Sequence, residues 1–152
     1  MKLVIRRNDG DPRDVKLLRV AVPFMLKRLL KPAQFSKVHL HITLTRLHGD
    51  FGDIEIETSP RFRLRLHHGM DTLVMLVTLA HELLHLSQVM HGRLELRKIK
   101  DLQVWYWDGE PYGSAPYDEL GSDIPWERDA GDKENDLARH FFTHYVTSLN
   151  GV

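Results

Sequence analysis

Hydrophobic residues recur at helical spacing in the first part of the chain. Between residues 13 and 30, the apolar positions that share one helix face are Val15, Leu18, Val22, Met25 and Leu29. Lys and Arg lie between them, which is typical of an amphipathic helix with one buried face. The pattern predicts one helix over residues 13–30, bent at Pro23, where the backbone lacks a hydrogen-bond donor.

The pattern changes to strict alternation of apolar and polar residues after residue 37. Three segments alternate in this way, 38–47, 53–57 and 61–66, and turns containing Gly, Asp, Ser and Pro separate them. A period of two is typical of strands with one buried and one solvated face, and short turns join antiparallel neighbours. The sequence therefore predicts an antiparallel-rich meander of three or more strands.

The longest apolar stretch, residues 70–90, has the length of a helix and lies between Gly69 and Gly92. Its ionisable residues would be costly to bury in lipid, so we expect a buried core helix and no membrane span. Strand-like pieces follow over residues 94–106, then a loop rich in Gly, Pro and Tyr, and a last helix from Pro125 to about residue 149. This order predicts an α+β fold with a sheet packed on the central helix and helices at both ends.

Composition narrows the function classes. The 152 residues, 42% of them hydrophobic, suit a single domain over residues 1–152. Lys plus Arg and Asp plus Glu both number 21, so no global field favours nucleic acid or an anionic membrane, and only a local basic patch stays open. Cysteine is absent, which leaves His and carboxylates as the strong metal ligands. The N-terminal residues lack the apolar core of a secretory signal, so we expect a cytoplasmic location.

The central helix carries the motif His81-Glu82-Leu83-Leu84-His85. Residues four apart in a helix are separated by about 40° of rotation and about 6 Å of rise, so His81 and His85 present both imidazoles on one face. Glu82 lies about 100° round from His81, where it can reach a water molecule bound to a shared metal. The spacing predicts zinc on the two histidines, with Glu82 as general base. A shuffled sequence would contain this pattern with a probability of roughly 3%, so composition alone does not explain it.

A third metal ligand must come from a downstream histidine or carboxylate, because catalytic zinc is held by three protein ligands and a water. Glu127 has the best position, in the first turns of the last helix, where the small Ala130 on the same face lets the two helices approach. His91 and Glu134 are the alternatives, and Asp129 fits better as a hydrogen-bond partner of a zinc-bound histidine. The predicted ligands of one zinc per chain are His81, His85 and Glu127.

Three stretches carry a resemblance to a known family: the motif at residues 81–85, the loop WDGEPY at residues 107–112, and the segment PWERDA at residues 125–130. They resemble the small HExxH zinc metallopeptidases of phages and bacteria, which are zincins and loosely similar to SprT-like proteins. The resemblance covers about a third of the chain. It implies a zincin-like fold with a gluzincin-like metal site. It also implies a location in the cytoplasm of a bacterium or of a phage-infected host. The later Gly-His-Gly-type zinc ligand of SprT proteins is not found, so their DNA-linked proteolysis is not carried over.

Other histidines and aromatic residues allow further interpretations. His91 fits a helix C-terminal cap, which the helix dipole favours. His140 and His144 are also four apart, but no base lies between them, and we expect surface or core positions. A tyrosine of the segment over the site could stabilise an oxyanion, and the sequence does not say which. The aromatic residues of that segment are Trp105, Tyr106, Trp107, Tyr112 and Tyr117.

Three functions fit this sequence. The first is peptide hydrolysis, with a peptide or protein substrate paired to an edge strand such as residues 61–66. The second is a non-enzymatic interaction module, in which a fourth protein ligand closes a structural zinc site. The third is a zinc hydrolase that acts on another substrate. Glu82 beside His81 favours the catalytic form, while the substrate and the oligomeric state stay open.

Overall fold

Seven strands and four helices form within residues 1–114 and 123–150, the part of the chain that the computed structural model describes, the side chain of Glu57 excepted. In chain order these elements are β1 (Lys2–Arg7), α1 (Pro12–Leu29), α2 (Pro32–Lys37), β2 (His39–Thr45), β3 (Gly52–Thr58), β4 (Arg61–His67), α3 (Thr72–Met90), β5 (Leu94–Ile99), β6 (Leu102–Trp107), β7 (Glu110–Gly113) and α4 (Pro125–Leu149). The architecture is α+β, as the sequence predicts.

The main sheet has the strand order β1-β2-β4-β3, with β1 and β4 both parallel to β2 and only β3 antiparallel to β4. The predicted antiparallel meander is therefore wrong for this sheet, because β4 lies between β2 and β3. Alternation predicts which face of a strand is buried, but it does not predict the neighbouring strand or its direction. β1 pairs with β2 over its whole length and was not predicted at all.

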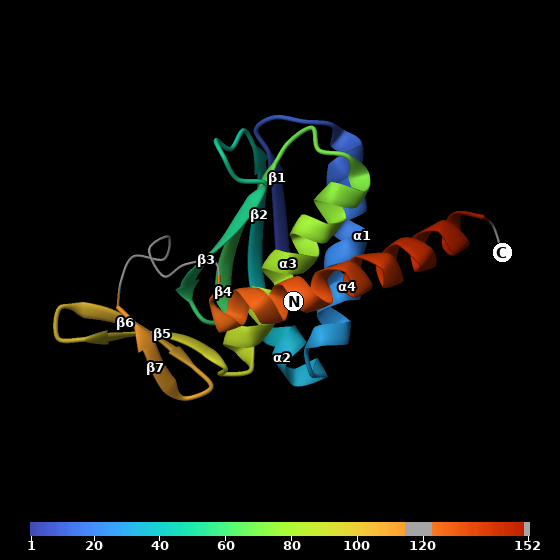
Figure 1. Cartoon of the computed structure of the whole chain (residues 1–152). Coiled ribbons are helices and arrows are strands. Elements are labelled where there is room, and N and C mark those ends of the chain that lie inside the picture. The colour runs from blue at the N-terminus through green and yellow to red at the C-terminus, as the bar shows by residue number, and fades with distance from the viewer. Residues whose placement is uncertain (115–122, 151–152) are drawn as a thin grey trace.

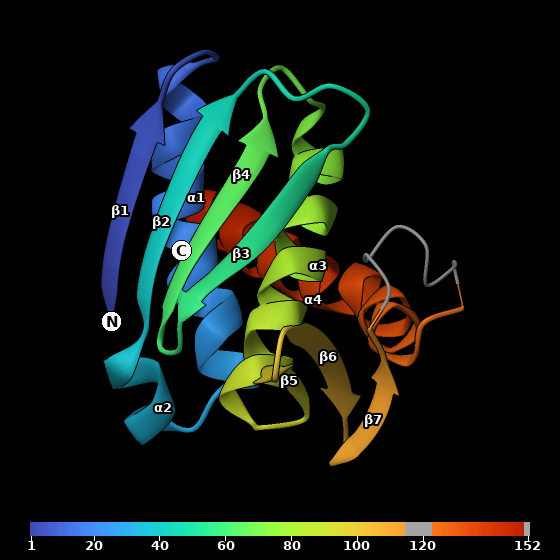
Figure 2. The same cartoon turned by 90° about the vertical axis from the view of Figure 1, so that its left-hand side faces the viewer.

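All the large helices lie on one face of the main sheet, as Figures 1 and 2 show. The side chains that β2 and β4 bury against α1 and α3 are Leu40, Ile42, Leu44, Phe62, Leu64 and Leu66. The helix α4 crosses α3 and packs against it, and its C-terminal part extends away from the sheet (Figure 1). The core helix α3 is thus enclosed by the sheet, α1 and α4.

The helix boundaries follow local signals in the sequence. Pro12 and Pro125 each occupy the first turn of a helix, where a missing backbone donor is harmless. Asp71 caps α3 by accepting a hydrogen bond from the Leu73 amide at 3.0 Å, and Gly92 follows its end with a φ of +73°. Among the described helices, only α3 is long and apolar enough to cross a membrane. However, 61% of its most apolar 18-residue stretch is buried inside the protein, as is typical of a core helix.

A second, antiparallel sheet of β5, β6 and β7 packs beside α4 around its own small core. That core consists of Leu94, Ile124 and Trp126, with Trp105 and Trp107 against it. The strands β5 and β6 match the predicted strand-like pieces, whereas β7 lies within the predicted loop. Tyr117, which was predicted to lie over the site, falls outside the described residues.

Gly52 allows β3 to lie close to α3, which yields a prediction for stability. A Cβ at Gly52 would lie 2.8 Å from Thr78 Cγ2 and 3.0 Å from the Arg65 carbonyl oxygen. We expect Gly52→Ala to lower the free energy of unfolding in urea by about 1–3 kcal/mol, because one methyl group overfills the contact. Thr78→Ser removes Cγ2 and should restore part of the loss.

Gly131, on α4, provides the matched control for that measurement. A Cβ there would meet nothing within 4 Å. We expect Gly131→Ala to stabilise the protein by about 0.5–1 kcal/mol, because Gly is the poorer residue in a helix interior. Equal stability of Gly52→Ala and the parent would contradict the close contact between β3 and α3.

Candidate metal centre

The helix α3 presents His81 and His85 on one face, as their spacing predicts. Their Nε2 atoms lie 3.1 Å apart, and the two rings meet edge to face. His85 is 8% exposed, and the His81 side chain is 21% exposed. Two nitrogen ligands of a tetrahedral zinc lie roughly 3.3 Å apart at a bond length of about 2.05 Å. The pair therefore has the separation that a shared metal ion requires.

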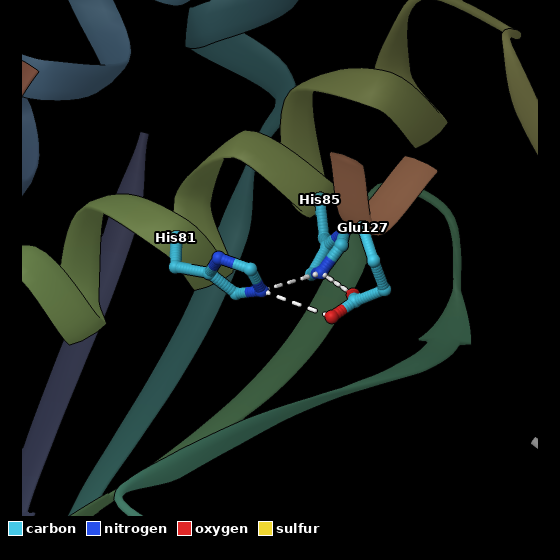
Figure 3. A group of neighbouring side chains, drawn as sticks. All are labelled: His81, His85 and Glu127. Carbon is cyan, nitrogen blue, oxygen red and sulfur yellow. Dashed lines mark hydrogen bonds and ion pairs between the residues drawn. The ribbon is translucent and has the colours of Figure 1, made fainter. Parts of the chain in front are cut away.

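Glu127 completes the group from the first turn of α4. Its Oε2 atom lies 3.3 Å from His81 Nε2, and its Oε1 atom makes a close contact with His85 Nε2. The three ligand atoms all lie within 4.8 Å of one another. Figure 3 shows the carboxylate and both imidazole rings pointing toward one another. The structure thus brings together the three predicted ligands, while zinc itself remains a prediction.

Packing of α4 against α3 fixes the position of Glu127. Two nearby side chains of α4, those of Trp126 and Ala130, are both fully buried. Trp126 also contacts the second sheet, with ring centroids 5.6 Å from Trp105 and 5.1 Å from Tyr112. Ala130 is fully buried in the helix that packs on α3, and its small side chain suits a close approach of the two helices.

A second layer of hydrogen bonds orients the two imidazoles. His81 donates from Nδ1 to Glu134 Oε2 at 2.7 Å, and His85 donates from Nδ1 to Gln88 Oε1 at 2.9 Å. Gln88 in turn donates to Asp129 Oδ2 at 2.9 Å. Such partners fix the ring orientation and leave each Nε2 lone pair for a metal.

This second layer changes the predicted roles of two carboxylates. Glu134, predicted as an alternative ligand, is the direct partner of His81, and Asp129, predicted as that partner, acts only through Gln88. Gln88 was missed by the sequence analysis. The sequence feature that could have identified Gln88 is its position as a polar residue in a buried apolar helix, three residues after His85. A buried polar side chain there needs a hydrogen-bond partner.

Glu82 is 8% exposed and lies on the wall of the adjoining pocket. Burial raises the pKa of its carboxyl to about 7, even though the two imidazoles act in the opposite direction. Burial by itself lowers the pKa of His81, but the hydrogen bond and charge of Glu127, together with Glu82 and Glu134, raise it to about 9. The carboxylates thus make His81 a strong site for a positive charge, and they leave Glu82 able to exchange a proton near neutrality.

The pocket beside the three ligands has a volume of about 530 Å³. One wall is β3, the outermost strand of the main sheet, and the others come from α3, the second sheet and α4. Its apolar lining residues are Ile54, Ile56, Phe62, Leu86, Val89, Leu94, Trp105 and Trp126. An apolar pocket with a few convergent polar groups is typical of a ligand-binding site.

The other candidate residues lie elsewhere. His91 caps α3 and donates from Nε2 to the Leu29 carbonyl at 2.8 Å, so it is a cap and not a member of the ligand group. His140 and His144 are exposed, and His144 stacks on Phe24 with centroids 4.9 Å apart. No tyrosine within residues 1–114 or 123–150 lines the pocket, so the predicted oxyanion role has no candidate there.

Comparisons with known proteins add nothing to this geometry. Models of protein families, curated proteins and solved structures were each compared with the chain, and none matches. The interpretation of the site therefore depends on the positions and chemistry of its own residues.

The two layers of the site should differ in their effect on metal affinity. We expect Glu127→Ala to weaken zinc binding most, because it removes a ligand, and Glu134→Ala to weaken it by about 10–100-fold, because it only loosens His81. His91→Ala should bind zinc like the parent. Competition with a chelating dye measures all three affinities, and parent-like binding by Glu127→Ala would exclude it as a ligand.

Proposed function

We propose that the chain is a zinc-dependent metallopeptidase, in which His81, His85 and Glu127 hold the metal. The observation that carries the proposal is the convergence of these three ligand atoms beside a buried glutamate on the wall of one pocket. Three protein ligands leave a coordination position for water, as catalytic zinc sites do. When bound, zinc supplies a Lewis acid that polarises a carbonyl group and lowers the pKa of water.

Glu82 is the general base in this proposal. Its position next to His81 in the helix brings it to the ligands without sharing their role, and no described residue is hydrogen-bonded to its carboxylate. With zinc bound, the Glu82 carboxylate could take a proton from the attacking water and return it to the leaving amine. The apolar walls of the pocket limit access of bulk water and strengthen these charge interactions.

The edge of β3 is the proposed binding place for an extended peptide. The strand predicted for this role, at residues 61–66, is β4, which lies inside the sheet between β2 and β3 and cannot pair with a substrate. In the described part of the chain β3 is the outer strand on the pocket side, and Ile54 and Ile56 line that pocket. A peptide added to this edge would place apolar side chains in the pocket and its backbone near the ligands.

A structural zinc site would instead need a fourth protein ligand. Among the described residues, the ligand group has three members, and the nearby Glu134 is already bonded to the far nitrogen of His81. This arrangement favours the open form of the site. Zinc binding by the parent without cleavage of any peptide in the assay below would favour a non-peptide substrate or a structural zinc. A cysteine-free chain fits our inference of a cytoplasmic setting.

Metal binding and hydrolysis should separate in two variants. We expect the purified protein to hold about one zinc per chain, and Glu82→Gln to keep that zinc while losing hydrolysis by about 10²–10⁴-fold, because only proton transfer is removed. His81→Ala should lose the zinc. Metal analysis and cleavage of a quenched peptide library measure the two properties, and full activity of Glu82→Gln would exclude this mechanism.

Zinc should also contribute to folding stability. The ligands join α3 to α4, so a metal that binds only the folded state stabilises it, by about 2.7 kcal/mol when zinc is at a hundred times its Kd. We expect excess chelator to lower the Tm of the parent but not that of His85→Ala. An unchanged parent melting curve, with zinc loss verified by metal analysis, would show that the helices pack independently of the ion.

A further inference from the structure

Among the described residues, no helix covers the face of the main sheet opposite α1, α3 and α4. In Figure 2 the strands β1, β2, β4 and β3 face the viewer, and α1, α3 and α4 lie behind them. Because side chains alternate along a strand, the residues that do not contact the core project from this open face. The outward side chains of β1, β2 and β4 with ionisable groups are Lys2, Arg6, His39, His41, Arg61, Arg63, Arg65 and His67.

Strand register aligns these side chains in rows across the sheet. In the first row Lys2 is aligned with His39 on β2, and His39 is aligned with Arg61 on β4. In another row Arg6 is aligned with Thr43 on β2, and Thr43 is aligned with Arg65 on β4. Neighbouring strands lie about 4.8 Å apart, and outward residues on one strand recur about every 6.6 Å. The Lys and Arg side chains of this face therefore come from β1 and β4, and the His and Thr side chains of β2 lie between them.

Acidic side chains balance only one margin of this array. Asp53 and Glu55 of β3 are aligned with Arg65 and Arg63, and Asp53 accepts a hydrogen bond from Arg65 Nε at 2.9 Å. No acidic residue occupies an outward position of β1, β2 or β4. Within the described strands, Lys2, Arg6 and Arg61 have no acidic residue aligned with them on a neighbouring strand, so this part of the face is a place where a bound polyanion would add stability.

We propose that this cationic sheet face, defined by Lys2, Arg6 and Arg61, binds the phosphate backbone of nucleic acid. Arginine suits phosphate because its guanidinium group donates two parallel hydrogen bonds. The outward positions of β1, β2 and β4 carry no Phe, Tyr or Trp on which bases could stack. Binding is therefore through the backbone and independent of sequence.

One other polyanion, an anionic membrane, fits the face less well. An anionic membrane would need apolar side chains to insert, and the one outward aliphatic residue of these three strands, Val4, is half-buried. The composition does not predict this cationic face, because the total charge of the chain is balanced. The face becomes apparent only when the strands are aligned.

The test is fluorescence anisotropy with a labelled 20-nucleotide single-stranded DNA and the matching duplex at three salt concentrations. We expect the parent to bind both, more weakly as salt rises, because phosphate contacts release counterions. The variant Lys2→Gln/Arg6→Gln/Arg61→Gln should bind the single strand about a hundredfold more weakly at 0.1 M salt. Each lost phosphate contact reduces the slope of log affinity against log salt concentration by about 0.7. A single Arg61→Gln variant should lose about fivefold, and it tests the same point if the triple variant does not fold.

The matched control removes the same charge from exposed positions on the helices, as Lys16→Gln/Arg19→Gln/Arg139→Gln. It should bind within about threefold of the parent, because those charges lie on the other side of the molecule and are screened. Equal loss in the control and the face variant would overturn the proposal, as would parent binding that does not respond to salt. Equal or tighter binding of a 20-residue polyglutamate, or binding to phosphatidylserine vesicles without binding to DNA, would also overturn it.

Discussion

Polar side chains in the middle of α3 need hydrogen-bond partners inside the protein, and the candidate metal centre depends on this need. His81, His85 and Gln88 lie on a helix that is enclosed by the sheet, α1 and α4. A buried polar group without a partner lowers stability by about 1–3 kcal/mol. The helix α4 supplies those partners through Glu127, Glu134 and its first-turn backbone. Polar contacts as well as apolar ones therefore set the position of α4 on α3.

Trp126 connects this helix pair to the second sheet. It is fully buried beside Leu94 and Ile124, and its ring contacts Trp105 and Tyr112. The next residue in the chain is Glu127, so the packing that holds the second sheet in place also holds a proposed metal ligand. The same tryptophan lines the pocket, which means that pocket shape and ligand position cannot change independently.

Local features could be predicted from the sequence, whereas pairings between distant segments could not. Periodicity and Pro125 located α3 and α4, and the four-residue spacing placed His81 and His85 on one face. Alternation identified β2, β3 and β4 but not the insertion of β4 between the other two, because strand order depends on contacts far apart in the chain. Whether Glu134 or Asp129 meets a histidine depends on the rotation of α4 against α3, which the pattern of one helix does not fix.

The charges around the ligands are arranged so that one carboxylate stays available for proton transfer. Glu127 and Glu134 contribute two negative charges at the histidines, and these match a divalent cation. The far nitrogen of His85 meets the neutral amide of Gln88, so no further charge is added there. Glu82 is the third carboxylate, and its burial raises its pKa to about 7. In the proposed zinc site the other two carboxylates would balance the charge of the ion, so Glu82 would not need to coordinate it and could serve as the base.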